Sequence, residues 1–176
     1  MASEFQREKI ARAFTAMDAD KDGFLEEADF AALAARWAGV RGWPPGSTAD
    51  TRLSSLIMGW WETLLAAYDV NTDGKVTFDE VLMVVDGLDT MFDVVTATAT
   101  EMFDAIDENT DGMISAVEYH RLIQTWTGQE IDTDEVFSML DLDGDGQISR
   151  DEFAQLWKEF WAGDDPGSPG TWVFGR

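Results

Sequence analysis

The sequence predicts an all-α protein of four helix–loop–helix motifs, arranged in two closely packed pairs with short β pairing between loops. Three observations predict this class. A 12-residue acidic segment with glycine at its sixth place occurs four times, starting at Asp18, Asp69, Asp107 and Asp141. Apolar residues with helical spacing flank each segment. The eighth place is always apolar and mostly β-branched, as expected where two neighbouring loops pair as antiparallel strands.

Composition limits the classes of partner. The chain has 176 residues, of which 45% are hydrophobic, enough for one domain or two small packed lobes. It carries 35 acidic and 12 basic residues, a net charge of -23, which favours cations and disfavours nucleic acid and membrane surfaces. Cysteine is absent, so disulfides and thiolate metal sites are excluded. No signal-like or membrane-spanning apolar run is present, and we expect a cytoplasmic monomer.

The four segments place oxygen-bearing groups where they can surround a calcium ion. Calcium binds six to eight oxygens, and short side chains at alternate places of a tight loop converge on one point. The first, third and fifth places hold Asp18, Asp20, Asp22; Asp69, Asn71, Asp73; Asp107, Asn109, Asp111; and Asp141, Asp143, Asp145. The seventh place, which offers a backbone carbonyl, holds Phe24, Lys75, Met113 and Gln147. The ninth holds Glu26, Thr77, Ser115 and Ser149, and the twelfth holds Asp29, Glu80, Glu118 and Glu152.

All four segments resemble the EF-hand pattern, and the fourth matches it at every ligand position. The resemblance covers residues 5 to about 162 and implies three or four bound calcium ions. In the first loop Asp29 is one methylene shorter than glutamate and gives the ion fewer oxygens. Magnesium, which prefers six ligands, is therefore possible there, although Glu26 could restore a calcium ligand.

The spacing divides the chain into an N-terminal pair of motifs (1–87), a C-terminal pair (88–162) and a Gly/Pro-rich tail (163–176). The loops start 51, 38 and 34 residues apart. The longest interval contains a Gly/Pro-rich connection at 39–50, followed by a predicted helix from Arg52 to Tyr68. Gly87 is expected to end a helix. Residues 88–95 are apolar rather than a charged tether, so the two pairs should pack on each other.

The first-loop features and the packed lobes are similar to the sarcoplasmic calcium-binding proteins, calexcitin and bacterial calerythrin. That resemblance implies a calcium buffer or signal modulator. The alternative is a calmodulin-like sensor that exposes an apolar groove to a partner protein, whose identity the sequence does not give. Eight methionines favour the sensor, because such grooves use flexible methionine. Eight tryptophans and eleven phenylalanines favour a rigid core that stays closed.

An enzyme is not expected. His120 is the single histidine and is interpreted as a surface or edge residue. One histidine and two tyrosines cannot rebuild the luminophore pocket of calcium-triggered photoproteins.

Two aromatic groups have open interpretations. Trp60 and Trp61 point about 100° apart on a helix, so we expect one in the core and the other partly buried, or else free as a docking surface. The tail ends in Trp172, Val173 and Phe174. These residues either dock into the protein's own apolar cleft, which we expect, or present a motif to a partner.

Overall fold

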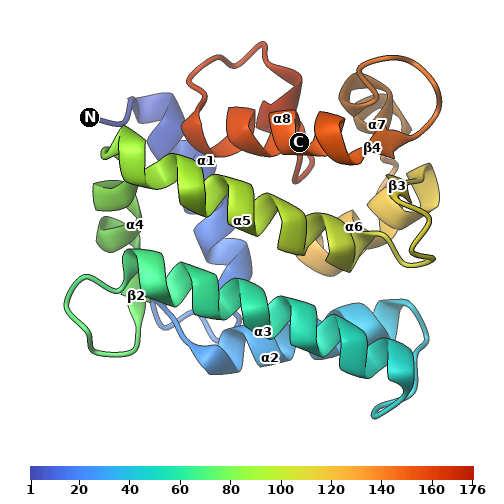
Figure 1. Ribbon diagram of the computed structural model, residues 1–176, viewed down its shortest axis with the longest axis horizontal. Coiled ribbons are helices and arrows are strands. Elements are labelled where there is room, and N and C mark those ends of the chain that lie inside the picture. Colours follow the sequence, from blue (N-terminus) through green and yellow to red (C-terminus); the bar gives the residue numbers. More distant parts are fainter.

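The computed structural model describes the backbone of residues 1–176 and the side chains of 1–87 and 92–176. Over this described backbone it contains eight α-helices and four two-residue strands (Figure 1). In chain order the elements are α1 (Glu4–Met17), β1 (Phe24–Leu25), α2 (Glu27–Val40), α3 (Thr48–Tyr68), β2 (Val76–Thr77), α4 (Phe78–Val85), α5 (Leu88–Ile106), β3 (Met113–Ile114), α6 (Ala116–Thr127), α7 (Asp134–Leu140), β4 (Ile148–Ser149), α8 (Arg150–Ala162) and the 3-10 helix η1 (Pro169–Trp172). The predicted fold class, four helix–loop–helix motifs with β pairing between loops, is confirmed.

The strands join the loops in two couples. β1 pairs antiparallel with β2, and β3 pairs antiparallel with β4. The eighth-place side chains lie opposite each other, Leu25 against Val76 and Ile114 against Ile148, and all four are buried. Each couple of loops is therefore held by a small apolar contact as well as by backbone hydrogen bonds.

The two pairs of motifs share one core. Figure 1 shows α5 running between α3 and α8, and α5 packs on both helices. At the centre, the ring of Trp60 on α3 lies 6.4 Å from Trp126 on α6 and 6.4 Å from Trp157 on α8. Because these rings come from both pairs, the apolar faces of the pairs cover each other.

The expectation that one of the two adjacent tryptophans is only partly buried is wrong. Trp60 and Trp61 are 1% and 4% exposed. The ring of Phe30 on α2 lies 5.2 Å from Trp60 and 5.0 Å from Trp61. Since α2 and α5 both pack on α3, two sides of the helix are covered and both indoles enter the core.

Two helix boundaries differ from the sequence prediction. Helix α3 begins at Thr48, four residues before Arg52, because the Ser47 hydroxyl accepts a hydrogen bond from the Asp50 amide at 3.2 Å. Helix α4 ends at Val85, and Gly87 is instead the N-cap of α5. Of the apolar run 88–95, the side chains of 88–91 lie outside the described residues, whereas Val95 is buried.

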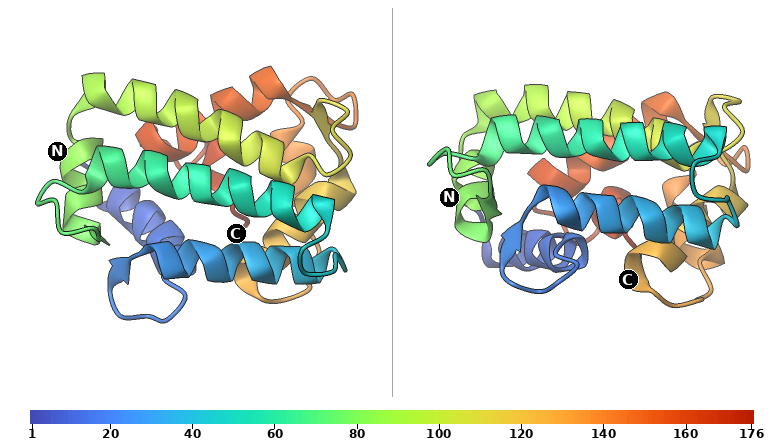
Figure 2. Two further views of the ribbon diagram at one scale, coloured as in Figure 1. Left: turned by 60° about the horizontal axis from the view of Figure 1, so that its bottom comes forward. Right: turned by 90° about the horizontal axis from the view of Figure 1, so that it is seen from below.

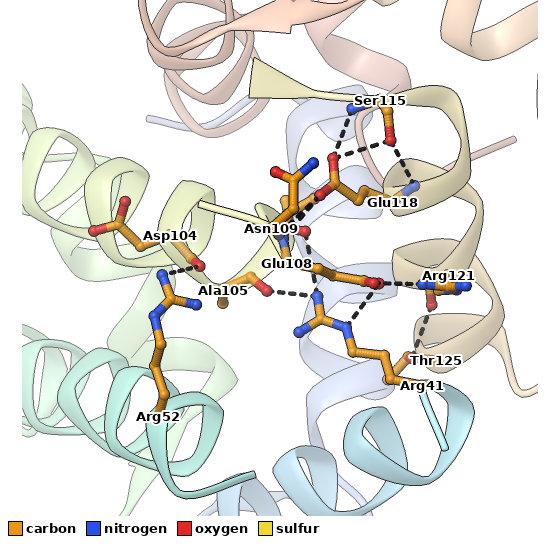
Figure 3. Close-up of polar contacts among 11 residues, drawn as sticks. Arg41, Arg52, Asp104, Ala105, Glu108, Asn109, Ser115, Glu118, Arg121 and Thr125 are labelled. Atoms are coloured by element: carbon orange, nitrogen blue, oxygen red, sulfur yellow. Dashed lines mark hydrogen bonds and ion pairs between the residues drawn. The ribbon is translucent and has the colours of Figure 1, made fainter. Parts of the chain in front are cut away.

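One buried arginine ties the connection after α2 to the third loop (Figure 3). Arg41 places its Nε 2.9 Å from Oε1 of Glu108, and its side chain is fully buried. Its Nη2 donates to the carbonyls of Ala105 at 2.6 Å and Ile106 at 3.2 Å, which lie at the end of α5. Burial lowers the pKa of Arg41 to about 10, against the opposing effect of Glu108, so the guanidinium remains charged at neutral pH.

Further contacts complete this cluster. Glu108 also pairs with Arg121 on α6. The Arg41 guanidinium lies 4.9 Å from the Trp37 ring and 4.7 Å from the Trp43 ring. Helix ends leave carbonyls without intrahelical partners, and here an arginine of the first pair caps a helix of the second. The arginine thus fastens the two pairs together.

We expect Arg41→Met to lower the free energy of unfolding of the calcium-loaded protein by about 3 kcal/mol, because it leaves Glu108 buried with one partner fewer and two carbonyls without their donor. Arg41→Lys should recover only part of this loss, since an ammonium lacks the guanidinium fork. Denaturant unfolding measures both. The control is Arg7→Met, at an exposed position of α1. Equal stability of the Arg41→Met and Arg7→Met proteins would contradict the role given to Arg41.

Candidate metal centres

In every loop the chain is wrapped around the first carboxylate. The Oδ1 atom of the first-place aspartate accepts a hydrogen bond from the fifth-place amide at 3.2 Å in each loop. Its Oδ2 accepts from the sixth-place glycine amide at 2.9, 3.0, 3.0 and 2.8 Å in chain order. These glycines, Gly23, Gly74, Gly112 and Gly146, have φ of 90°, 81°, 82° and 88°. A side chain would be strained there, so the turn requires glycine.

The third and fifth places continue the same pattern. The third-place oxygen accepts from the fifth-place amide at 3.1, 2.9, 3.0 and 3.0 Å in chain order. The fifth-place oxygen accepts from the seventh-place amide at 2.9, 3.0, 2.9 and 2.9 Å. Such local turns are typical of Asp and Asn. They set the side chains of alternate places on the same side of the loop.

Two loops bring three carboxylates together. Oxygens of Asp18, Asp20 and Asp22 all lie within 4.8 Å of one another in the first loop, and those of Asp141, Asp143 and Asp145 do so in the fourth. In the second and third loops the third place is an asparagine amide, so each has one charge fewer among these three places.

Mutual repulsion is visible in the pKa values of the third-place aspartates. The amide hydrogen bond from Asp22 lowers the pKa of Asp20, but desolvation and the neighbouring carboxylates outweigh it and raise the pKa. The pKa of Asp143 is raised in the same way, against the hydrogen bond from the Asp145 amide. A divalent cation relieves this repulsion.

The twelfth-place carboxylates close three of the loops with both oxygens. Oε1 of Glu118 accepts from the amides of Glu108 and Asn109 at 2.9 and 3.4 Å, while Oε2 accepts from the Ser115 amide at 2.8 Å. Glu152 repeats this arrangement. For Glu80, Oε1 accepts from the Asn71 amide at 3.4 Å and Oε2 from the Thr77 amide at 2.8 Å. The hydrogen bond from the Thr77 amide lowers the pKa of Glu80. These glutamates also form capping boxes with the ninth-place hydroxyls, so the residues that face the loop also start the exiting helices.

The shorter Asp29 closes the first loop differently. Its Oδ1 accepts from the Ala19 amide at 2.9 Å and its Oδ2 from the Glu26 amide at 2.8 Å. Each glutamate in the other loops reaches the third-place amide, whereas the hydrogen bonds of Asp29 within the described residues come from the second and ninth places. Asp29 is 4% exposed.

The ninth place of the first loop is also different. Glu26 forms an ion pair with the Nζ of Lys75, the seventh-place residue of the second loop, and this hydrogen bond raises the pKa of Lys75. The same ammonium lies 5.0 Å from the ring of Phe24. The Glu26–Lys75 ion pair thus links the first and second loops. Glu26 is both a ligand place of the first loop and the partner of Lys75.

The donor set fits a hard divalent cation. The side chains at the ligand places carry carboxylate, amide and hydroxyl oxygens, and the seventh place offers a backbone carbonyl. Calcium and magnesium prefer such oxygen ligands. The residues that would hold the ion are those at the first, third, fifth, seventh, ninth and twelfth places.

Residues outside the loops have other roles. Nδ1 of the half-buried His120 lies 3.3 Å from the Thr133 hydroxyl oxygen, in keeping with an edge position. The sequence interpretation missed Arg41 and Glu108. Glu108 occupies the second place of the third loop, which is not a ligand position, and Arg41 carries no local signal. Among the described residues, no helix combines the length and apolar character needed to cross a membrane.

The paired loops, the glycine turns and the helix flanks define the class of calcium-binding EF-hand proteins. An EF-hand domain pair matches residues 96–158 and an EF hand matches residues 10–34. The chain belongs to the EF-hand family.

Within this family the chain is related to calerythrin and the sarcoplasmic calcium-binding proteins. It is 25% identical to calerythrin of Saccharopolyspora erythraea, over 93% of this chain and 96% of the relative. It is 28% identical to sarcoplasmic calcium-binding protein alpha-B and -A chains of Penaeus sp., over 90% and 88%.

Solved structures agree on the fold. A Streptomyces coelicolor calcium-binding protein matches with a TM-score of 0.76 at 21% identity, over 91% of this chain and 99% of that one. The sarcoplasmic calcium-binding protein from amphioxus matches with a TM-score of 0.72 at 18% identity, over 100% and 99%.

We expect Asp29→Glu to increase the calcium affinity of the first loop several-fold relative to its magnesium affinity. The longer side chain reaches the third-place amide, as the glutamates of the other loops do, and offers the ion two oxygens. The matched control is the reverse exchange, Glu118→Asp in the third loop, which should lower the same ratio. Calorimetric titration with calcium in the presence and absence of magnesium measures both. If neither exchange alters the ratio, side-chain length at the twelfth place does not set selectivity.

Proposed function

We propose that the protein is a calcium buffer or signal modulator that binds three or four calcium ions in its loops. The second, third and fourth loops bind calcium through their six ligand places, the twelfth of which is Glu80, Glu118 and Glu152 respectively. The first loop accepts calcium or magnesium. Folding is coupled to binding, because clustered carboxylates repel each other without a cation. The proposal includes a cytoplasmic, monomeric protein with a binding rather than a catalytic role.

One observation carries the choice of buffer or modulator over sensor. The apolar faces of the two pairs are closed against each other around Trp60, Trp126 and Trp157, so a groove for a partner helix would require the shared core to separate. Large exposed apolar residues are scattered over the described part of the chain: Met1, Phe24, Val70, Met83, Phe92, Val117 and Leu142. The Streptomyces coelicolor protein of the same fold is described as a calcium-mediated regulator, which supports a modulator.

A groove-opening sensor is the second candidate, and the tail is the observation that favours it. Val173 is 1% exposed, and the Phe174 ring stacks on Trp126 with centroids 4.1 Å apart. The Tyr119 hydroxyl donates to the Val173 carbonyl at 3.1 Å. We propose that the tail (163–176) is a third unit of the chain that plugs the core. A partner could compete for this position if the tail were released.

Calcium titration of the full chain separates the two candidates. We expect three or four sites by calorimetry and a fall in the fluorescence of an uncharged apolar dye, Nile red, as calcium is added, because binding completes the closed core. A sensor predicts the opposite change, a rise in Nile red fluorescence at calcium saturation. Fewer than three sites would contradict the proposed assignment of the loops.

Removal of residues 164–176 from the calcium-loaded protein should lower the melting temperature and increase Nile red binding, because it uncovers Trp126 and Phe160. The single change Phe174→Ala should lower the free energy of unfolding by about 2 kcal/mol, less than a fully buried aromatic, since Phe174 is half-buried. Phe92→Ala, at a side chain that is 46% exposed, is the matched control and should have little effect. Unchanged melting and dye binding after truncation would show that the tail does not plug the core.

A further inference from the structure

A cavity of about 730 Å³ lies beside the first metal-binding loop and extends away from it along α1. Its walls come from α1, α2, the end of α6, α8 and the tail, and they include Ala13, Arg36, Trp126, Phe160 and Trp172. In the right-hand view of Figure 2 the C-terminus lies between the dark blue α1 and the gold end of α6. The cavity volume is in the range of pockets that hold a small organic molecule, roughly 300–1,000 Å³.

The charge around this cavity is the reverse of the charge of the whole chain. Five of the 12 basic residues line it, Lys9, Arg12, Lys21, Arg36 and Arg176. Only two of the 35 acidic residues do so, Glu8 and Asp18. In a protein of net charge -23, a basic rim at one cavity is not explained by composition.

Most of these cations are not neutralised by a neighbouring carboxylate. Within the described side chains, the ion pairs do not include Arg12, Lys21 or Arg36, and all three are exposed. Lys9 is 6% exposed, and its Nζ donates to the carbonyls of Gly163 at 2.7 Å and Glu159 at 3.2 Å. The rim therefore offers guanidinium groups that can bind an anion in two-pronged fashion.

The interior of the cavity is aromatic. Phe174 stacks on Trp126, with its ring also 5.0 Å from Phe160. Phe5 and Trp172 complete the apolar lining. An apolar wall below a cationic rim matches a molecule that has an apolar body and one anionic end.

We propose that this cavity binds a small organic carboxylate with an apolar body, such as a medium-chain aliphatic acid. The apolar body lies against Trp126, Phe160 and Phe174, and the carboxylate faces Arg12 and Arg36. A protein partner is disfavoured, because a cavity of this volume is the size of a small-molecule pocket.

Asp18 and Lys21 connect the cavity to the first loop, since both residues line it and both belong to that loop. A cation held in the loop offsets the negative charge that Asp18 presents to the cavity, so an anionic ligand there is repelled less. Binding of the carboxylate and of the first-loop cation should then favour each other, as linkage requires the effect to be reciprocal. This coupling rests on the proposed function, whereas the cavity itself does not.

The test uses the full chain at micromolar free calcium with decanoate as the probe and decanol as the uncharged analogue. We expect decanoate to bind one-to-one by calorimetry, to change tryptophan fluorescence through Trp126 and Trp172, and to bind at least about tenfold more tightly than decanol. Equal affinity for the two molecules, or no saturable binding of decanoate, would overturn the proposal.

Variants locate the site. Arg12→Gln combined with Arg36→Gln should weaken decanoate binding at least about tenfold and leave decanol binding unchanged, because both side chains are exposed and the fold does not depend on them. Arg7→Gln, on the same helix but outside the cavity lining, is the matched control and should bind decanoate normally. Unweakened binding in the double variant would overturn the assignment.

The number of calcium sites, measured without decanoate, tests the proposed function independently. A calcium-binding isotherm that does not change when decanoate is added would overturn the coupling.

Discussion

The rest of the structure depends on one constraint, which is that the apolar faces of the two EF-hand pairs are buried against each other. Each pair leaves an apolar face that must be covered, and here each pair covers the other. Trp60 of the first pair meets Trp126 and Trp157 of the second. The tail lies beside this contact, because Phe174 packs on Trp126 and Trp157, the two tryptophans of the second pair that meet Trp60.

Electrostatics opposes this burial until cations are bound. The chain gathers carboxylates at four loops, and the raised pKa values of Asp20 and Asp143 reflect the repulsion within two of them. The same loops begin the exiting helices, since Glu80, Glu118 and Glu152 are both loop-closing carboxylates and partners in capping boxes. A cation that fixes these carboxylates therefore also fixes the helices that form the core.

The sequence predicts the loops and strands well because their determinants are local. Aspartate and glycine at fixed places specify each turn, and the eighth-place residues specify the strand pairing. Helix α3 starts earlier than predicted, since the capping role of Ser47 is hidden within a Gly/Pro-rich segment. The prediction that one of Trp60 and Trp61 is only partly buried is wrong, because periodicity gives the direction of a side chain on its helix but not which neighbours cover it. Contacts between distant residues could not be predicted at all: nothing near Arg41 or Glu108 indicates the other, and the cationic cavity combines residues from both ends of the chain. The unit boundary at Gly87 and the assignment of individual calcium ligands stay predictions.

Scanning calorimetry of the calcium-loaded full chain tests most directly the central claim that the two EF-hand pairs share one core. A shared core predicts a single unfolding transition whose calorimetric and van't Hoff enthalpies agree. Two separable transitions, one for each pair, would contradict it.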